Sequence, residues 1–215
     1  MLMKSGKEKV PFYENSSSYT LAGLMALAGC ALMLASAFLN WKSLVVMTDE
    51  KVTGGVTFYK VIKQGLDSIF IRNIDNEITN ISFNFNGALP VILSVLFAFI
   101  ILFLLIAGIK DNFTRTDFFV NKKKRIRIIS LLILIVIVII MTHTTIFRGI
   151  TDQLQELSKS WGTYVEEAQK NHVNGADKMY VHYHLGMGGV FFWIGVVLYF
   201  GSVVLNFILE TLNED

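Results

Sequence analysis

Three histidines in the second half of the chain are the residues best suited to binding a metal ion. His182 and His184 are two residues apart, so on a β-strand both side chains point to one face, and His172 precedes them. Three imidazoles are a possible ligand set for Zn²⁺. The alternatives are solvated histidines, or a surface that responds to pH near neutrality. Alternation along the strand predicts that His182 and His184 face water. The same alternation predicts that the other three side chains face inward, namely Val181, Tyr183 and Leu185.

No group of residues with catalytic spacing is present. The sequence lacks G-x-S-x-G, a Walker loop, H-E-x-x-H and C-x-x-C. The acidic pairs Asp49-Glu50 and Glu166-Glu167 lie in polar segments, where solvation explains them. We therefore expect no enzymatic activity and no cofactor, and a membrane enzyme is the least supported hypothesis.

The composition is typical of an integral membrane protein. Of the 215 residues, 53% are apolar and 17% are charged, against about 25% charged in an ordinary globular chain. All charged residues lie outside four apolar stretches, at 19–41, 87–109, 128–147 and 188–209. Each stretch has the roughly 20 residues with which a helix crosses the hydrocarbon core. A soluble chain of this size has no core that could bury four such helices. We predict a mainly α membrane protein with a four-helix transmembrane bundle.

Lysine and arginine residues concentrate on one side of the predicted membrane. Segment 110–127 has seven of them, whereas charge is nearly balanced in segments 42–86 and 148–187. The positive-inside rule makes segment 1–18, segment 110–127 and the tail 210–215 cytoplasmic, and the two balanced segments extracellular. Anionic lipid headgroups attract such a basic cluster, so the pattern indicates the lipid bilayer as partner, and no nucleic acid. We expect a multi-pass plasma-membrane protein. The residues expected at the membrane interface are Trp41, Lys122, Lys123, Lys124, Arg125 and Arg127.

One alternative would remove the first span. Ala35-Ser36-Ala37 follows an apolar run and resembles a signal-peptidase site, and cleavage there would leave three spans. Against this, the preceding segment is long and partly polar, and apolar character continues to Trp41. We interpret Trp41 as an interfacial anchor that ends the first span.

Small residues recur at four-residue spacing in the first span, at Ala22, Ala26 and Cys30 and again at Ala31 and Ala35. Such rows let helix backbones approach closely. They fit either packing within the bundle or a face for a homo-oligomer.

No predicted span contains Asp, Glu, Lys or Arg. Channels and transporters usually need ionisable groups or broken helices at membrane depth, so transport is the secondary hypothesis. His143, about one turn from the outer end of the third span, is either a polar side chain at the interface or part of a proton relay.

The first extracellular segment has the pattern of a small β-rich unit. Residues 43–47 and 52–56 predict a β-hairpin, and Thr57 is placed to cap a short helix. Residues 81–85 alternate between apolar and polar, which predicts a strand that pairs with 69–71.

The second extracellular segment predicts a helix followed by a strand. Apolar residues recur at intervals of three and four from Ile146 to Ala168, so the third span continues as an amphipathic helix with Gly149 and Gly162 as hinges. Together with a strand over 180–185, these patterns predict a small extracellular α/β cap. Its strands form a sheet that rests on the helix and has an edge open to a partner strand. The candidate partner contacts are Phe83, Phe85, Trp161, Tyr164 and Tyr183.

Two stretches resemble uncharacterised small four-span membrane proteins of bacteria. The first is Phe38-Leu39-Asn40-Trp41-Lys42-Ser43 with the following segment 54–62, and the second is Gly186-Met187-Gly188-Gly189-Val190-Phe191-Phe192-Trp193. Span order and a β-rich first outer segment are also similar to claudin topology. The claudin cysteine pair of the outer loop is missing, because Cys30 is the only cysteine. The resemblance implies a topology and no activity.

The sequence thus predicts a membrane binding or accessory protein whose cap recognises another membrane or envelope protein or a peptide. The alternative is a small transporter or channel subunit.

Overall fold

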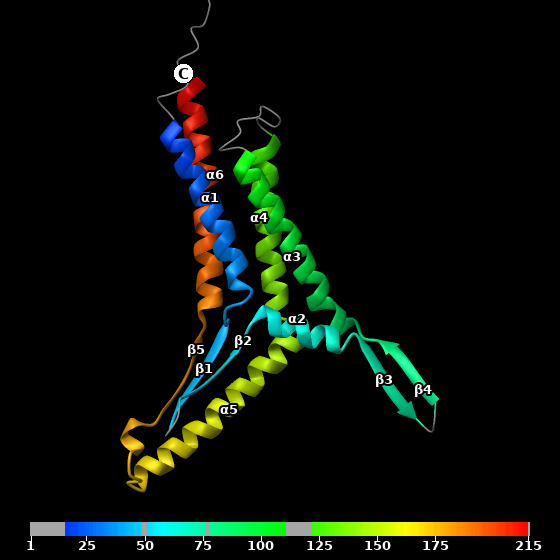
Figure 1. Cartoon of the computed structure of the whole chain (residues 1–215), viewed down its shortest axis with the longest axis vertical. Helices are drawn as coiled ribbons and strands as arrows, with labels where there is room; N and C mark the ends of the chain where they lie inside the picture. Colours follow the sequence, from blue (N-terminus) through cyan, green and yellow to red (C-terminus); the bar gives the residue numbers. More distant parts are fainter. Residues whose placement is uncertain (1–15, 49–50, 76–77, 111–121, 215) are drawn as a thin grey trace, which may run out of the picture.

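The computed structural model describes residues 16–48, 51–75, 78–110 and 122–214, as a bundle of long helices with a smaller cap at one end (Figure 1). The helices are α1 (Ser16–Ser36), α2 (Phe58–Asp67), α3 (Phe85–Ile109), α4 (Lys122–Thr142), α5 (Thr145–Lys170), η2 (Ala176–Lys178) and α6 (Met187–Glu214). The strands are β1 (Lys42–Met47), β2 (Lys51–Val56), β3 (Phe70–Asp75), β4 (Ile78–Phe83) and β5 (Tyr180–Leu185).

The bundle consists of α1, α3, α4 and α6. Three of its helices are long and apolar enough to cross a membrane, over Phe85–Ile109, Arg125–Thr142 and Met187–Leu209. The fourth, α1, provides a shorter apolar stretch, Thr20–Ser36, within the described residues. Three candidate spans are therefore present, and a fourth stays a prediction. The helix α1 ends at Ser36, so the last residues of the expected span 19–41 form a turn that leads into β1.

The helices α1 and α6 are packed backbone to backbone. A Cβ atom on Gly29 would lie 2.7 Å from the Gly195 carbonyl oxygen, and a Cβ on Gly195 would lie 2.7 Å from the Gly29 carbonyl oxygen. Ala22, Ala26 and Cys30 are buried, so the first row of small residues in α1 is used for packing inside this chain. Close approach of this kind gives helices dispersion contacts that larger side chains would prevent.

The cap is built on a three-stranded antiparallel sheet of order β2-β1-β5. The predicted hairpin is confirmed, with Ser43 opposite Gly55 and Met47 opposite Lys51. The helix α5 packs against all three strands. Thr57 caps α2 as predicted, because its hydroxyl accepts a hydrogen bond from the Lys60 N–H at 3.0 Å.

The strands β3 and β4 pair with each other, as predicted, with Phe70 opposite Phe83. They form a separate two-stranded sheet, so the expectation of one sheet for all the loop strands is wrong. The hairpin leaves the start of α3 on the side away from β5 (Figure 1). The helix α2 lies between the two sheets in the sequence and packs on α3, and its Gly65 faces the Gly87 carbonyl oxygen there.

The helix is interrupted between α4 and α5, so the prediction of one continuous helix is wrong. The helix α4 ends at Thr142, and α5 starts at Thr145 and leaves in a different direction (Figure 1). Thr144 has extended backbone angles and caps α5 by accepting from the Phe147 N–H at 3.3 Å. By contrast, α5 is unbroken through Gly149 and Gly162, the two expected hinges. The polar Thr142–Thr144 sequence makes the break because its side chains bond the local backbone.

Bundle and cap are joined by an aromatic core around Trp41, which is 8% exposed. The Trp41 ring stacks on Phe58 with centroids 4.5 Å apart and planes at 13°. Its Nε1–H donates to the Ser36 carbonyl oxygen at 2.9 Å, and its backbone N–H donates to Val56 at 2.7 Å. Trp41 is therefore buried between the bundle and the cap and contacts both. The expected role of Trp41 as an interfacial anchor stays a prediction, and its indole packs inside the protein against Phe58 of α2.

Candidate functional site

The outer edge of β5 is open. Among the described residues, β5 pairs with β1 alone, and its other side has no strand beside it (Figure 1). Each of its six residues has a backbone N–H and C=O, and the groups that point away from β1 are available to another strand. Tyr180 and Leu185, at its two ends, are exposed. The edge is a template onto which an extended peptide can add.

The register identifies which face of the sheet is covered. Leu44, Gly54 and Tyr183 lie in one row across the three strands. A Cβ on Gly54 would lie 3.3 Å from Cδ2 of Leu154, so this row faces α5. Tyr183 therefore points to α5, where burial and then the Asp152 carboxylate raise its pKa above the usual 10.0. The predicted inward direction of Tyr183 is confirmed.

His182 and His184 lie on the opposite face of the sheet, with ring centroids 4.7 Å apart. His182 is exposed as predicted, but His184 is half-buried, and its Nδ1 is buried without a hydrogen-bond partner. Leu185 lies on the same sheet face as Tyr183, as predicted, but its side chain is 61% exposed and not buried. It lines a hollow at the break between α4 and α5, together with Phe147.

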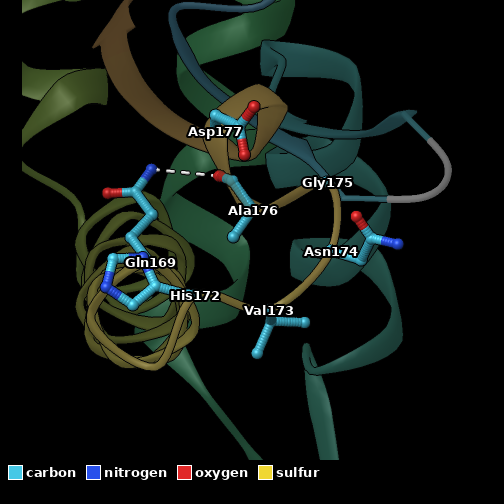
Figure 2. Close-up of a pocket in the computed structure, with 7 residues that line it drawn as sticks. All are labelled: Gln169, His172, Val173, Asn174, Gly175, Ala176 and Asp177. Atoms are coloured by element: carbon cyan, nitrogen blue, oxygen red, sulfur yellow. Dashed lines mark hydrogen bonds between the residues drawn. The ribbon is translucent and has the colours of Figure 1, made fainter.

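His172 does not join the other two histidines. It lines an open hollow of about 570 Å³ at the end of α5 (Figure 2). There Gln169 Nε2 donates to the Ala176 carbonyl oxygen at 3.1 Å, and Gly175 has a φ of 85°. These contacts hold the turn itself. Within the described ranges, no three His, Cys, Asp or Glu side chains are grouped so that they could hold a metal ion.

The predicted partner contacts fall into separate groups. Trp161 and Tyr164 form an edge-to-face pair on α5, with centroids 5.6 Å apart, and Tyr164 is exposed. Phe83 and Phe85 are exposed at the base of the β3–β4 hairpin, where Phe83 packs on Phe70 at 6.1 Å. Figure 1 separates this hairpin from the sheet that contains β5. The hairpin phenylalanines therefore lie apart from the sheet that contains β5.

One arginine of the predicted membrane interface, Arg127, is buried inside the bundle. Arg127 is 2% exposed. Its Nε–H donates to the Tyr199 hydroxyl at 3.1 Å, and that hydroxyl donates to the Leu104 carbonyl oxygen at 2.9 Å. The guanidinium carbon also lies 5.2 Å from the centre of the Tyr199 ring. The interfacial assignment of Arg127 stays a prediction, and the structure adds that the side chain points into the bundle near the start of a candidate span.

The neighbouring basic residues differ from Arg127. Arg125 is exposed, as expected for an interfacial side chain. Lys122, Lys123 and Lys124 open α4, and their side chains lie outside the described part of the structure.

Two further polar residues of α6 are buried on the same helix face as Tyr199. Ser202 and Asn206 follow Tyr199 by three and seven residues, a spacing that aligns side chains along one face. The Ser202 hydroxyl and both polar atoms of the Asn206 amide are buried without hydrogen-bond partners. This spacing was visible in the sequence and is the signal that could have located the polar interior.

Comparisons with protein-family models, with curated proteins and with solved structures found no match to this chain.

Proposed function

We propose that this protein is a membrane-anchored binding or accessory module, and that its partner is an extended segment of another membrane or envelope protein that adds to β5. The observation that carries the proposal is the open outer edge of β5. Strand addition supplies main-chain hydrogen bonds, and pockets for alternate side chains supply specificity.

Side chains next to this edge support the proposal. The exposed Tyr180 and Leu185 lie at the two ends of the strand, and Tyr164 and Trp161 lie on the helix behind the sheet. Tyrosine and tryptophan dominate many interfaces because they bury a large area with few rotatable bonds. The proposed partner contacts are therefore β5 and the aromatic pair on α5.

The proposed placement has four spans, with both termini and the basic segment 110–127 in the cytoplasm and the cap outside the plasma membrane. Its support is the seven lysines and arginines of that segment. An impermeant thiol reagent applied to intact cells is expected to label Asn174→Cys at once and Arg125→Cys only after permeabilisation. The reverse pattern would place the cap in the cytoplasm.

The strand-addition proposal is tested by photo-crosslinking in living cells. A photoreactive residue at position 180 and, separately, at position 185 is expected to give an adduct of the same mass with one partner protein. The matched control is position 52, since Val52 is also exposed but lies on the opposite edge strand, β2. An equal adduct at position 52, or no adduct at either β5 position, would refute the proposal.

A second candidate, a small transporter or channel subunit, is favoured by Arg127. An ionised side chain buried between candidate spans is expensive and commonly serves the movement of an ion or substrate. In reconstituted vesicles, an ion flux that Arg127→Met abolishes while Arg125→Met preserves it would support this candidate. An absence of flux above that of empty vesicles would reject it.

A further inference from the structure

A hollow lies between the bundle and the cap. Its volume is about 280 Å³, and it lies where α4 ends, α5 begins, β1 starts and β5 stops. It is lined by Trp41, Lys42, Thr142, His143, Phe147, Arg148, Thr151, Asp152 and Leu185. We propose that it binds the headgroup of a phospholipid that has both a phosphate and a primary ammonium, as in phosphatidylethanolamine.

Two cations border the hollow. Lys42 is half-buried at the start of β1, and Arg148 is exposed in the first turn of α5. Neither side chain forms a hydrogen bond or ion pair with another residue in the described ranges. The hollow also faces the N-terminal turn of α5, where the helix dipole favours an anion. A phosphodiester is the anion that two cations and a helix start would stabilise together.

One carboxylate completes the charge pattern. Asp152 follows Arg148 by one helical turn and lines the same hollow. It opposes a simple anion, but it matches the ammonium group that lies a few bonds from the phosphate in phosphatidylethanolamine. The arrangement of two positive groups and one negative group is therefore complementary to a zwitterionic headgroup.

The rest of the wall combines apolar side chains with the polar Thr142, His143 and Thr151, and it lies at the end of the apolar helix α4. Phe147 and the exposed Leu185 provide hydrocarbon surface next to the charges, which suits the first carbons of the lipid chains. The apolar helix α4 ends at Thr142, so the hollow lies where its hydrocarbon-facing surface stops. This inference rests on the bundle being in a bilayer, and it does not rest on strand addition to β5.

The test uses the full-length protein in lipid nanodiscs that contain phosphatidylcholine with either phosphatidylethanolamine or phosphatidylglycerol. Native mass spectrometry then counts the lipids that remain bound after release. We expect preferential retention of phosphatidylethanolamine, reduced about tenfold or more by Lys42→Gln with Arg148→Gln, because two charge-assisted hydrogen bonds are lost. The control pair Lys63→Gln with Lys159→Gln removes the same charge from exposed positions outside the hollow and is expected to retain the lipid.

Two further measurements distinguish a site for a zwitterionic lipid from a site for a free anion. Asp152→Asn is expected to remove the preference for phosphatidylethanolamine over phosphatidylglycerol, and this single exposed substitution also serves if the double variant does not fold. Unchanged retention by the double variant, or an unchanged preference in Asp152→Asn, would overturn the proposal. Displacement of the lipid by inorganic phosphate would indicate a free-anion site and would overturn the lipid assignment.

Discussion

Arg127 and Tyr199 are hydrogen-bonded across the interior of the bundle. The guanidinium Nε–H donates to the tyrosine hydroxyl at 3.1 Å, and the hydroxyl donates a hydrogen bond to the Leu104 carbonyl oxygen at 2.9 Å. Through one side chain, α6 is thus bonded to both α4 and α3. Because Tyr199 is completely buried, water cannot replace these bonds if the hydroxyl is removed.

Tyr199→Phe is expected to destabilise the bundle by about 1–3 kcal/mol, because it leaves a buried guanidinium N–H without this acceptor. The measurement is the loss of helical circular dichroism on thermal unfolding in detergent. Tyr164→Phe is the matched control, since that ring is exposed, and it is expected to change stability by less than about 0.5 kcal/mol. Equal stability of the two variants would contradict the role assigned to the hydroxyl.

Gly29→Ala is expected to separate α1 from α6 and to destabilise the protein by about 1–3 kcal/mol. The added methyl would meet backbone atoms, at 2.7 Å from the Gly195 oxygen and 2.9 Å from the Tyr199 nitrogen, and backbone has little freedom to move. At Gly201 the corresponding methyl meets only Cε of Met25, the end of a flexible side chain. Gly201→Ala is therefore expected to be nearly neutral in the same unfolding measurement. A loss for Gly201→Ala as large as for Gly29→Ala would refute this account.

Gly149→Ala and Gly162→Ala are expected to stabilise α5 by about 0.5–1 kcal/mol each, because alanine has the higher helix propensity. Both glycines lie within the helix, and a Cβ at either one meets nothing within 4 Å. Hydrogen exchange of the α5 amides measures the effect. Faster exchange in the variants would indicate that α5 needs the glycines as hinges.

Alkaline pH is expected to destabilise the cap through Tyr183. Burial, and then the charge of Asp152, raise the pKa of Tyr183 in the folded protein, so folding favours the protonated phenol. This contribution to stability is complete below the ordinary pKa of about 10 and is lost as the pH rises through the folded-state value. Unfolding temperatures measured over an alkaline pH series are therefore expected to fall more steeply for the natural protein than for Tyr183→Phe. Asp152→Asn is expected to lower the pH at which tyrosinate absorbance appears, and a rise would contradict the assignment.

Much of the cap could be predicted from the sequence because its signals are local. The β1–β2 hairpin follows from two β-prone runs on either side of a polar sequence, and the Thr57 hydroxyl precedes a helix in the usual capping position. Pairing of β3 with β4 was predicted from the alternation over residues 81–85. Which strands share a sheet depends on the path of the chain in space, so the separation of the β3–β4 hairpin was not predictable from its residues.

The burial of Trp41 and Arg127 inside the protein was not predicted, and one cause explains both cases. Each residue lies at the end of an apolar stretch, where tryptophan and arginine commonly meet lipid headgroups. An inward direction gives the same linear pattern and differs only in the available partners, here the Ser36 carbonyl oxygen for Trp41 and the Tyr199 hydroxyl for Arg127. The helical phase of α6 provided a clue, since Tyr199, Ser202 and Asn206 share one face.

The strand β5 and the helix α6 are connected with almost no intervening chain. A single residue, Gly186, separates the last residue of the strand from the first residue of the helix, and its N–H is fixed to the Trp41 carbonyl oxygen at 3.0 Å. Because Gly186 is held in this way, a displacement of β5 would move the first turn of α6 and the Trp41 backbone with it.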